Sequence, residues 1–122
     1  MGAKFTREDF QIAAKAAGLD IWTGGNHFDE RGGYPIGLDS EGGYEAIWNP
    51  AADDGDSRRL QCVLGLSLEF KQGENFSNIV RADGYHGWGY FEAEQAFDVG
   101  DDASAARDVV LRCAIAIGRA MP

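Results

Sequence analysis

The fold is decided in residues 44–60, which read YEAIWNPAADDGDSRRL. Residues 44–48 predict a short strand, and Pro50 stops it because proline cannot continue a central ladder of hydrogen bonds. Asn49 can cap a first turn, with Pro50 at its first helical position. A helix then runs to residue 64. The stretch therefore predicts a strand that turns sharply into a helix.

Three aspartates, Asp53, Asp54 and Asp56, form an acidic start to this helix. Asp53 and Asp56 offer a second possible cap and capping partner, and acidic residues also stabilise the positive end of a helix dipole. A calcium loop would need further oxygen ligands and a terminal Glu at fixed offsets. Cys62 stands six residues after Asp56 and is not such a ligand. Helix capping is thus favoured over metal binding.

The first helix is predicted over residues 7–17. Thr6 can cap it with Asp9 as its reciprocal partner, and Phe5 and Phe10 match the hydrophobic staple that fixes a helix start. At the other end of the chain, Asp101 or Asp102 can cap a last helix, in which apolar residues recur at spacings of four and three at positions 106, 110, 113, 117 and 120. Further apolar residues lie off that stripe, so this last helix is expected to be contacted on more than one side.

The whole pattern predicts one domain over residues 1–122. The expected elements are a helix at 7–17, strands at 19–22 and 44–48, a helix ending at 64 with Leu60, Val63 and Leu64 inward, strands at 66–70, 76–82 and 85–97, and a last helix. Asp83 and Gly84 signal a hairpin turn. No βαβ alternation repeats, so we expect the α+β class: a mostly antiparallel sheet packed with about three helices, an α/β sandwich.

Residues 24–43 are rich in glycine, at seven of twenty positions. The segment is either a ragged hairpin or one long loop, and long loops in compact domains tend to be functional. His27, Asp29, Glu30 and Tyr34 are its candidate contacts for a partner or ligand. Histidine beside carboxylates can serve acid-base or metal chemistry. The glycine-rich phosphate-binding motifs are absent, however, and we predict no catalytic, metal or cofactor site.

Residues 85–91, which read YHGWGYF, hold two further candidate contacts, Trp88 and Tyr90. Most aromatic residues are expected in the core, whereas one or two exposed ones suit a protein interface. Few basic residues accompany them, which disfavours stacking on nucleic-acid bases. The glycines on either side of Trp88 indicate a bulge or a close backbone approach.

The formal net charge of -9 sets limits on partners. Phosphate binding needs a basic surface, so a protein partner is favoured over nucleic acid, and a homo-oligomer stays open. Cys62 and Cys113 lie in apolar helical patterns and are predicted to be buried free thiols. No apolar run approaches the roughly 20 residues of a membrane span. With no signal-peptide pattern at the start, we expect a cytoplasmic protein without membrane contact.

Residues 48–50, 53–57 and 60–64, together with the end at 112–122, resemble a group of small bacteriophage and prophage proteins. Those proteins carry a similar WNP…DDGD stretch and belong to the phage ABA sandwich type of domain. The resemblance covers about half of the chain. It implies an α/β sandwich expressed in bacterial host cytosol, and it carries over no catalytic residue.

These observations favour a small acidic phage accessory protein that is not an enzyme and that binds a host or phage protein. One alternative is a small-molecule binder or small enzyme that uses residues 24–43. Another is an acidic inhibitor of a host complex that handles nucleic acid or serves defence, in which carboxylates compete for a basic surface.

Overall fold

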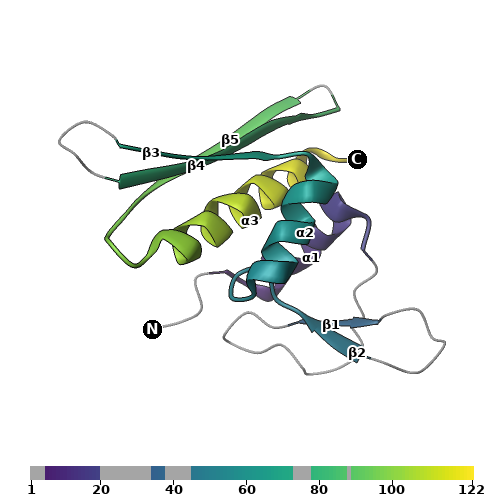
Figure 1. The fold of residues 1–122 in the computed structure, drawn as a ribbon. Helices are drawn as coiled ribbons and strands as arrows, with labels where there is room; N and C mark the ends of the chain where they lie inside the picture. The colour runs from purple at the N-terminus through teal and green to yellow at the C-terminus, as the bar shows by residue number, and fades with distance from the viewer. Residues whose placement is uncertain (1–4, 20–33, 38–44, 73–77, 88) are drawn as a thin grey trace.

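The computed structural model describes residues 5–19, 34–37, 45–72, 78–87 and 89–122. Within them lie α1 (Arg7–Ala17), β1 (Tyr34–Gly37), β2 (Glu45–Trp48), α2 (Asp54–Leu64), β3 (Ser67–Gln72), β4 (Asn78–His86), β5 (Gly89–Phe97) and α3 (Asp102–Ala120) (Figure 1). Every strand pair is antiparallel. The predicted α+β class is confirmed, with a two-stranded sheet, β1–β2, separate from the three-stranded sheet β3–β4–β5.

Helix α1 begins and ends as its sequence predicts. The Thr6 hydroxyl accepts from the Asp9 N–H at 3.1 Å, and the Asp9 carboxylate accepts from the Thr6 N–H at 2.9 Å. This capping box satisfies two backbone donors that the helix cannot pair itself. The rings of Phe5 and Phe10 meet edge to face at 6.4 Å, and both side chains are buried. The staple and the core position of Phe10 are therefore confirmed.

The corner between β2 and α2 uses both of the caps that the sequence offers. The Asn49 side chain accepts from the Ala52 N–H, and Asp53 caps α2 by accepting from the Asp56 N–H at 2.8 Å. The buried Asp56 carboxylate accepts in turn from the Asn49 N–H at 2.9 Å, which closes the corner. Trp48 then packs edge to face against Phe10 at 6.2 Å and ties β2 to α1.

Two predictions for α2 are wrong. Leu60 and Leu64 are buried, but Val63 is 62% exposed and Cys62 is exposed too. The buried residues of α2 form one narrow stripe along the helix, at positions 56, 57, 60 and 64. Residues 62 and 63 point away from this stripe. Cys113, by contrast, is buried as predicted.

The hairpin turn between β4 and β5 lies later than predicted. Strand β4 continues through Asp83 and Gly84 to His86, which pairs with Gly89. Gly84 serves close packing instead, since a Cβ there would lie 3.1 Å from the carbonyl oxygen of Gly65. The chain reverses at Gly87, whose φ of 60° suits a tight turn. As a result Tyr85 belongs to β4 and not to the strand that follows.

Strand predictions at the edges of the glycine-rich segment have mixed outcomes. Leu19 lies outside any strand and donates its N–H to Ala14 at the end of α1. The rest of the strand predicted at 19–22 lies outside the described residues. Within 24–43, only Tyr34–Gly37 is described, and it forms β1, which pairs with β2.

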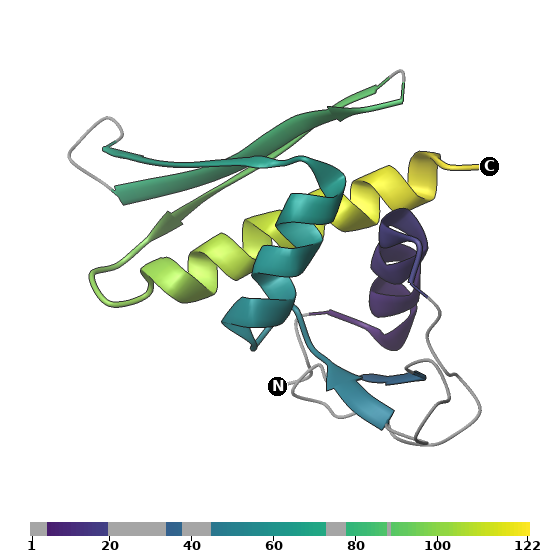
Figure 2. The same ribbon diagram turned by 45° about the vertical axis from the view of Figure 1, so that its right-hand side comes forward.

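Helix α3 is the centre of the molecule. The sheet β3–β4–β5 covers one side of it, and α1 and α2 pack against it from the other (Figure 2). Leu111 is fully buried and Ile115 nearly so, which confirms contacts on more than one side. The backbones of α1 and α3 nearly touch where Gly118 crosses Ile12. No helix within the described ranges is long and apolar enough to cross a membrane.

Candidate functional site: the outer face of the sheet

The structure describes only part of the predicted contact set. Tyr90 lies in β5, and Tyr34 lies in β1 opposite Trp48. His27, Asp29, Glu30 and Trp88 lie outside the described residues, so the glycine-rich contact site stays a prediction.

Tyr90 forms part of an exposed aromatic pair. Strand alternation turns Val80 and Ala82 of β4 toward the helices, where both are fully buried. The opposite face of the sheet carries Tyr85, which is 78% exposed, and Tyr90, which is 43% exposed. The two residues are direct cross-strand partners, and their ring centroids lie 4.9 Å apart. The two tyrosine rings thus form an exposed apolar surface, with hydroxyl groups at its margin, near the turn of the β4–β5 hairpin.

A polar network fixes Tyr90 in place. Arg81 donates to the Tyr90 hydroxyl oxygen at 2.7 Å, and that hydroxyl donates to Asp83 at 2.6 Å. Arg81 also pairs with Glu92 and lies 3.5 Å from Asp83. The hydrogen bond to Asp83 raises the pKa of Tyr90, because ionisation of the phenol would remove that donated bond. These contacts therefore fix the orientation of the Tyr90 ring.

The charges on this outer face are mostly acidic. Among the described residues of the three strands, four outward carboxylates, on Glu69, Asp83, Glu92 and Glu94, accompany Lys71 and Arg81, which gives a formal charge of -2. Lys71 reaches Glu94 at 3.4 Å across the sheet. The face thus presents an exposed pair of aromatic rings surrounded mainly by carboxylates.

Sequence reasoning found Tyr90 but missed Tyr85 and Arg81. The signal was the alternation of β4, which places residues 81, 83 and 85 on one face once the strand is known to continue to His86. Because the turn was expected at 83–84, Tyr85 was assigned to the following strand, and its pairing with Tyr90 was lost.

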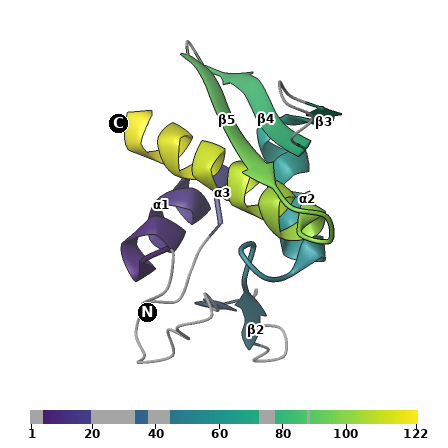
Figure 3. The same ribbon diagram turned by 90° about the vertical axis from the view of Figure 1, so that its left-hand side faces the viewer.

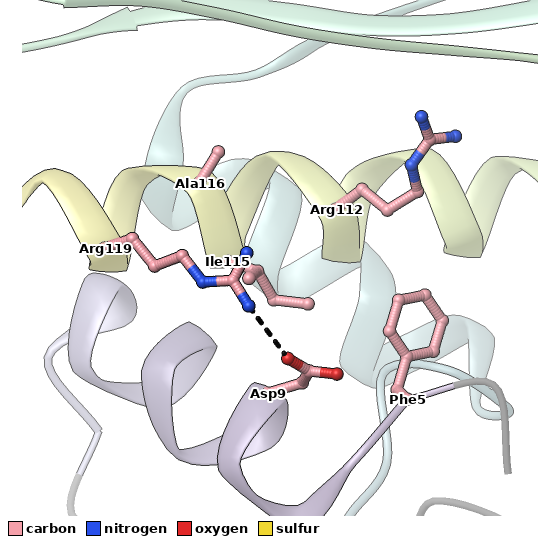
Figure 4. A pocket seen from close by; sticks show the side chains of 6 residues that line it. All are labelled: Phe5, Asp9, Arg112, Ile115, Ala116 and Arg119. Atoms are coloured by element: carbon pink, nitrogen blue, oxygen red, sulfur yellow. Dashed lines mark hydrogen bonds and ion pairs between the residues drawn. The ribbon is translucent and has the colours of Figure 1, made fainter.

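A second candidate is a hollow of about 330 Å³ between α1 and α3 (Figure 4). Phe5 and Ile115 contribute apolar surface to its lining, and Asp9 pairs with Arg119 at 3.4 Å beside them. Arg112 extends away from Asp9 and donates to the Glu94 carbonyl oxygen at 3.3 Å. Both arginines beside the hollow are therefore already paired with groups of the protein. For this reason the outer face of the sheet is the stronger candidate site.

The described residues hold no assembled reactive centre. No group of three or more His, Cys, Asp or Glu in that part of the chain is placed to hold a metal ion. The Cys113 thiol donates to the Ala82 carbonyl oxygen at 3.4 Å, and burial raises its pKa to about 11. A thiol in that state is a poor nucleophile at neutral pH. The aspartates at the start of α2 are engaged in capping and in pairs with Arg59 and Arg107.

No family model matches the chain, and no curated protein or solved structure matches it either.

Proposed function

We propose that this protein acts by binding another protein through the outer face of β3–β4–β5, with Tyr85 and Tyr90 as its anchor. The observation that carries the proposal is the exposed tyrosine pair, in which Arg81 and Asp83 hold the Tyr90 hydroxyl and the Tyr85 ring lies against that of Tyr90. Tyrosine supplies large contact area with few rotatable bonds, and it is enriched at protein interfaces. An anchor that is already oriented loses less conformational freedom on binding.

The charge around the anchor supports a basic partner. The outer face carries more carboxylates than cations, and the whole chain has a formal charge of -9. Such a field speeds the encounter with a basic surface, and added salt should slow association more than it speeds dissociation. The resemblance to phage proteins supports a bacterial host or phage protein as the partner and a non-enzymatic accessory role in the host cytosol.

The proposal is tested by crosslinking from defined positions. A photoreactive phenylalanine analogue replaces Tyr85 in one variant and Val99 in a matched control, because Val99 is 92% exposed but lies beyond the end of β5. After irradiation in bacterial lysate, we expect one basic protein to be captured from position 85 and not from position 99.

Binding to the captured protein is then measured directly. Tyr85→Ala should weaken it at least about tenfold, as truncation of a binding hot spot does. Val99→Ala should leave it unchanged. Equal capture from both positions would contradict the proposal, as would tight binding to duplex DNA with no protein recovered.

A further inference from the structure

Strand β3 has a free edge in the described part of the chain. The sheet order is β3–β4–β5, so β3 and β5 form its two edges (Figure 3). Its neighbour β4 pairs with only one side of β3. A strand at the edge of a sheet presents unpaired N–H and C=O groups that can bind another strand.

The hairpin register shows which backbone groups are free. His86 and Gly89 are the last paired residues before the chain reverses at Gly87. In a tight hairpin the pair that closes the turn exchanges both backbone hydrogen bonds. Alternation from that pair turns the N–H and C=O groups of Leu68, Phe70 and Gln72 away from β4. By the same alternation the carbonyl oxygen of Leu66 also points away from β4. It accepts a hydrogen bond from the Gln61 side chain of α2 at 3.1 Å.

The side chains of β3 are complementary to a second copy of themselves. Glu69 and Lys71 lie on the outer face, one residue to each side of Phe70. If two copies pair antiparallel about a two-fold axis at Phe70, Glu69 of each copy lies directly opposite Lys71 of the other. These are positions without backbone hydrogen bonds between them, where facing side chains come closest.

Other registers lose this complementarity. An axis at Glu69 would place Glu69 opposite itself, and an axis at Lys71 would do the same for lysine. An axis at Leu68 would set Glu69 opposite Ser67 and form no ion pair. Charge therefore selects the register centred on Phe70.

Exposed apolar surface lies at the same point. Phe70 is 52% exposed, and its ring meets that of Phe97 edge to face at 6.1 Å. Pairing about Phe70 places the two copies of this side chain beside each other, on the face opposite the charges. The contact would remove apolar area from water at the centre of the interface.

The other edge of the sheet offers no such ion pair, because β5 contains no lysine or arginine. Glu92 and Glu94 lie on either side of Ala93 in β5, so a two-fold axis at Ala93 would set glutamate against glutamate. Arg112 already occupies the Glu94 carbonyl oxygen there. The two edges thus differ in their ability to bind a second copy.

We propose that β3 is a self-association edge, through which two copies join their sheets antiparallel about Phe70. Lys71 would keep its contact with Glu94 of its own chain while it faces Glu69 of the second copy. The outer faces then become continuous and present two Tyr85–Tyr90 pairs. One strand pairing is a small interface, so the dimer should dissociate on dilution. The inference does not depend on the proposed protein-binding function.

Sedimentation velocity from low micromolar to near-millimolar protein tests the inference. The wild type should shift from monomer to dimer as its concentration rises. Glu69→Lys sets lysine against lysine and Lys71→Glu sets glutamate against glutamate, so each should weaken association at least about tenfold. Controls with the same charge changes at exposed sites, Glu8→Lys and Arg58→Glu, should leave association unchanged.

Two restoring arms make the test specific. The double variant Glu69→Lys/Lys71→Glu recovers opposite charges across the axis and should dimerise again. A mixture of the two single variants should form a heterodimer, although each alone stays monomeric. Circular dichroism confirms that each variant is folded, and a variant that unfolds is replaced by Phe70→Lys. A wild type that is monomeric throughout, or singles that dimerise as well as the wild type, would overturn the inference.

Discussion

The crossing of α1 and α3 depends on the absence of one side chain. A Cβ added at Gly118 would lie 2.2 Å from the carbonyl oxygen of Ile12 and 2.9 Å from its carbonyl carbon. Ordinary contacts begin at 3.4 Å, so the helices must separate locally by about 3.4 − 2.2 = 1.2 Å. The Cγ2 atom of the Ile12 side chain would also lie at 2.6 Å, but the nearest obstructing atom belongs to the backbone, so a rotamer change of Ile12 cannot relieve the clash.

We therefore expect Gly118→Ala to destabilise the fold. Overpacking costs about 1–3 kcal/mol, and a backbone clash belongs at the upper end of that range. The gain in helix propensity from glycine to alanine offsets about 1 kcal/mol. The net loss of about 2 kcal/mol corresponds to a fall in Tm of roughly 6–10 °C for a chain of this size, measured by calorimetry.

A glycine in α2 supplies the matched control. A Cβ at Gly55 would meet only the ends of the Arg59 and Asp53 side chains, at 3.2 Å, and these can move. Gly55→Ala should leave Tm unchanged or raise it slightly. An unchanged or higher Tm for Gly118→Ala would refute the close crossing. Rescue of Gly118→Ala by Ile12→Ala would show that the side chain, and not the backbone, is the obstacle.

Three further predictions follow from burial and charge. Leu64→Ala should cost about 2–4 kcal/mol of unfolding free energy in a denaturant titration, whereas Val63→Ala should change it by less than about 0.5 kcal/mol; equal losses would place both on one buried face. Asp56→Ala should cost about 1–3 kcal/mol because it leaves the Asn49 N–H without its acceptor, and added calcium should not stabilise the wild type beyond a salt control. Burial raises the pKa of Cys113 from 9.0 to about 11, so the folded state holds a proton that the unfolded state has lost. Its contribution to stability is therefore full below pH 9 and declines as pH rises toward 11, and a Cys113→Ala variant should show a shallower alkaline decline in Tm.

The local signals in this sequence were sufficient for the ends of α1 and α2, whereas Asp101 at the start of α3 makes no side-chain capping hydrogen bond. Thr6, Asp9 and Asp53 act on backbone groups within a few residues of themselves, so their geometry follows from spacing alone. The same holds for Gly18 and Gly65, whose positive φ values end α1 and α2.

Non-local packing explains the failures. Gly84 looked like a turn residue, but its role depends on Gly65 and Leu66, which approach it from another element. Val63 looked like a core residue because it was placed on one helix face with Leu60 and Leu64, yet its side chain is 62% exposed. The pairing of Tyr85 with Tyr90 depends on where the hairpin turn lies. A shift of the register by one residue would move every side chain of a strand to the other face of the sheet.

The two faces of the sheet differ in burial, and this difference makes the proposed binding surface testable. Val80, Ala82 and Ala93 on the inner face are buried against the helices, so changes there would disturb the core. On the outer face the charges form exposed pairs, each of which contributes little to stability. Substitutions at Tyr85 or Lys71 should therefore alter binding and association while the fold persists. A loss of function at those positions can then be assigned to the surface itself, because the inner face and α3 carry the stability of the domain.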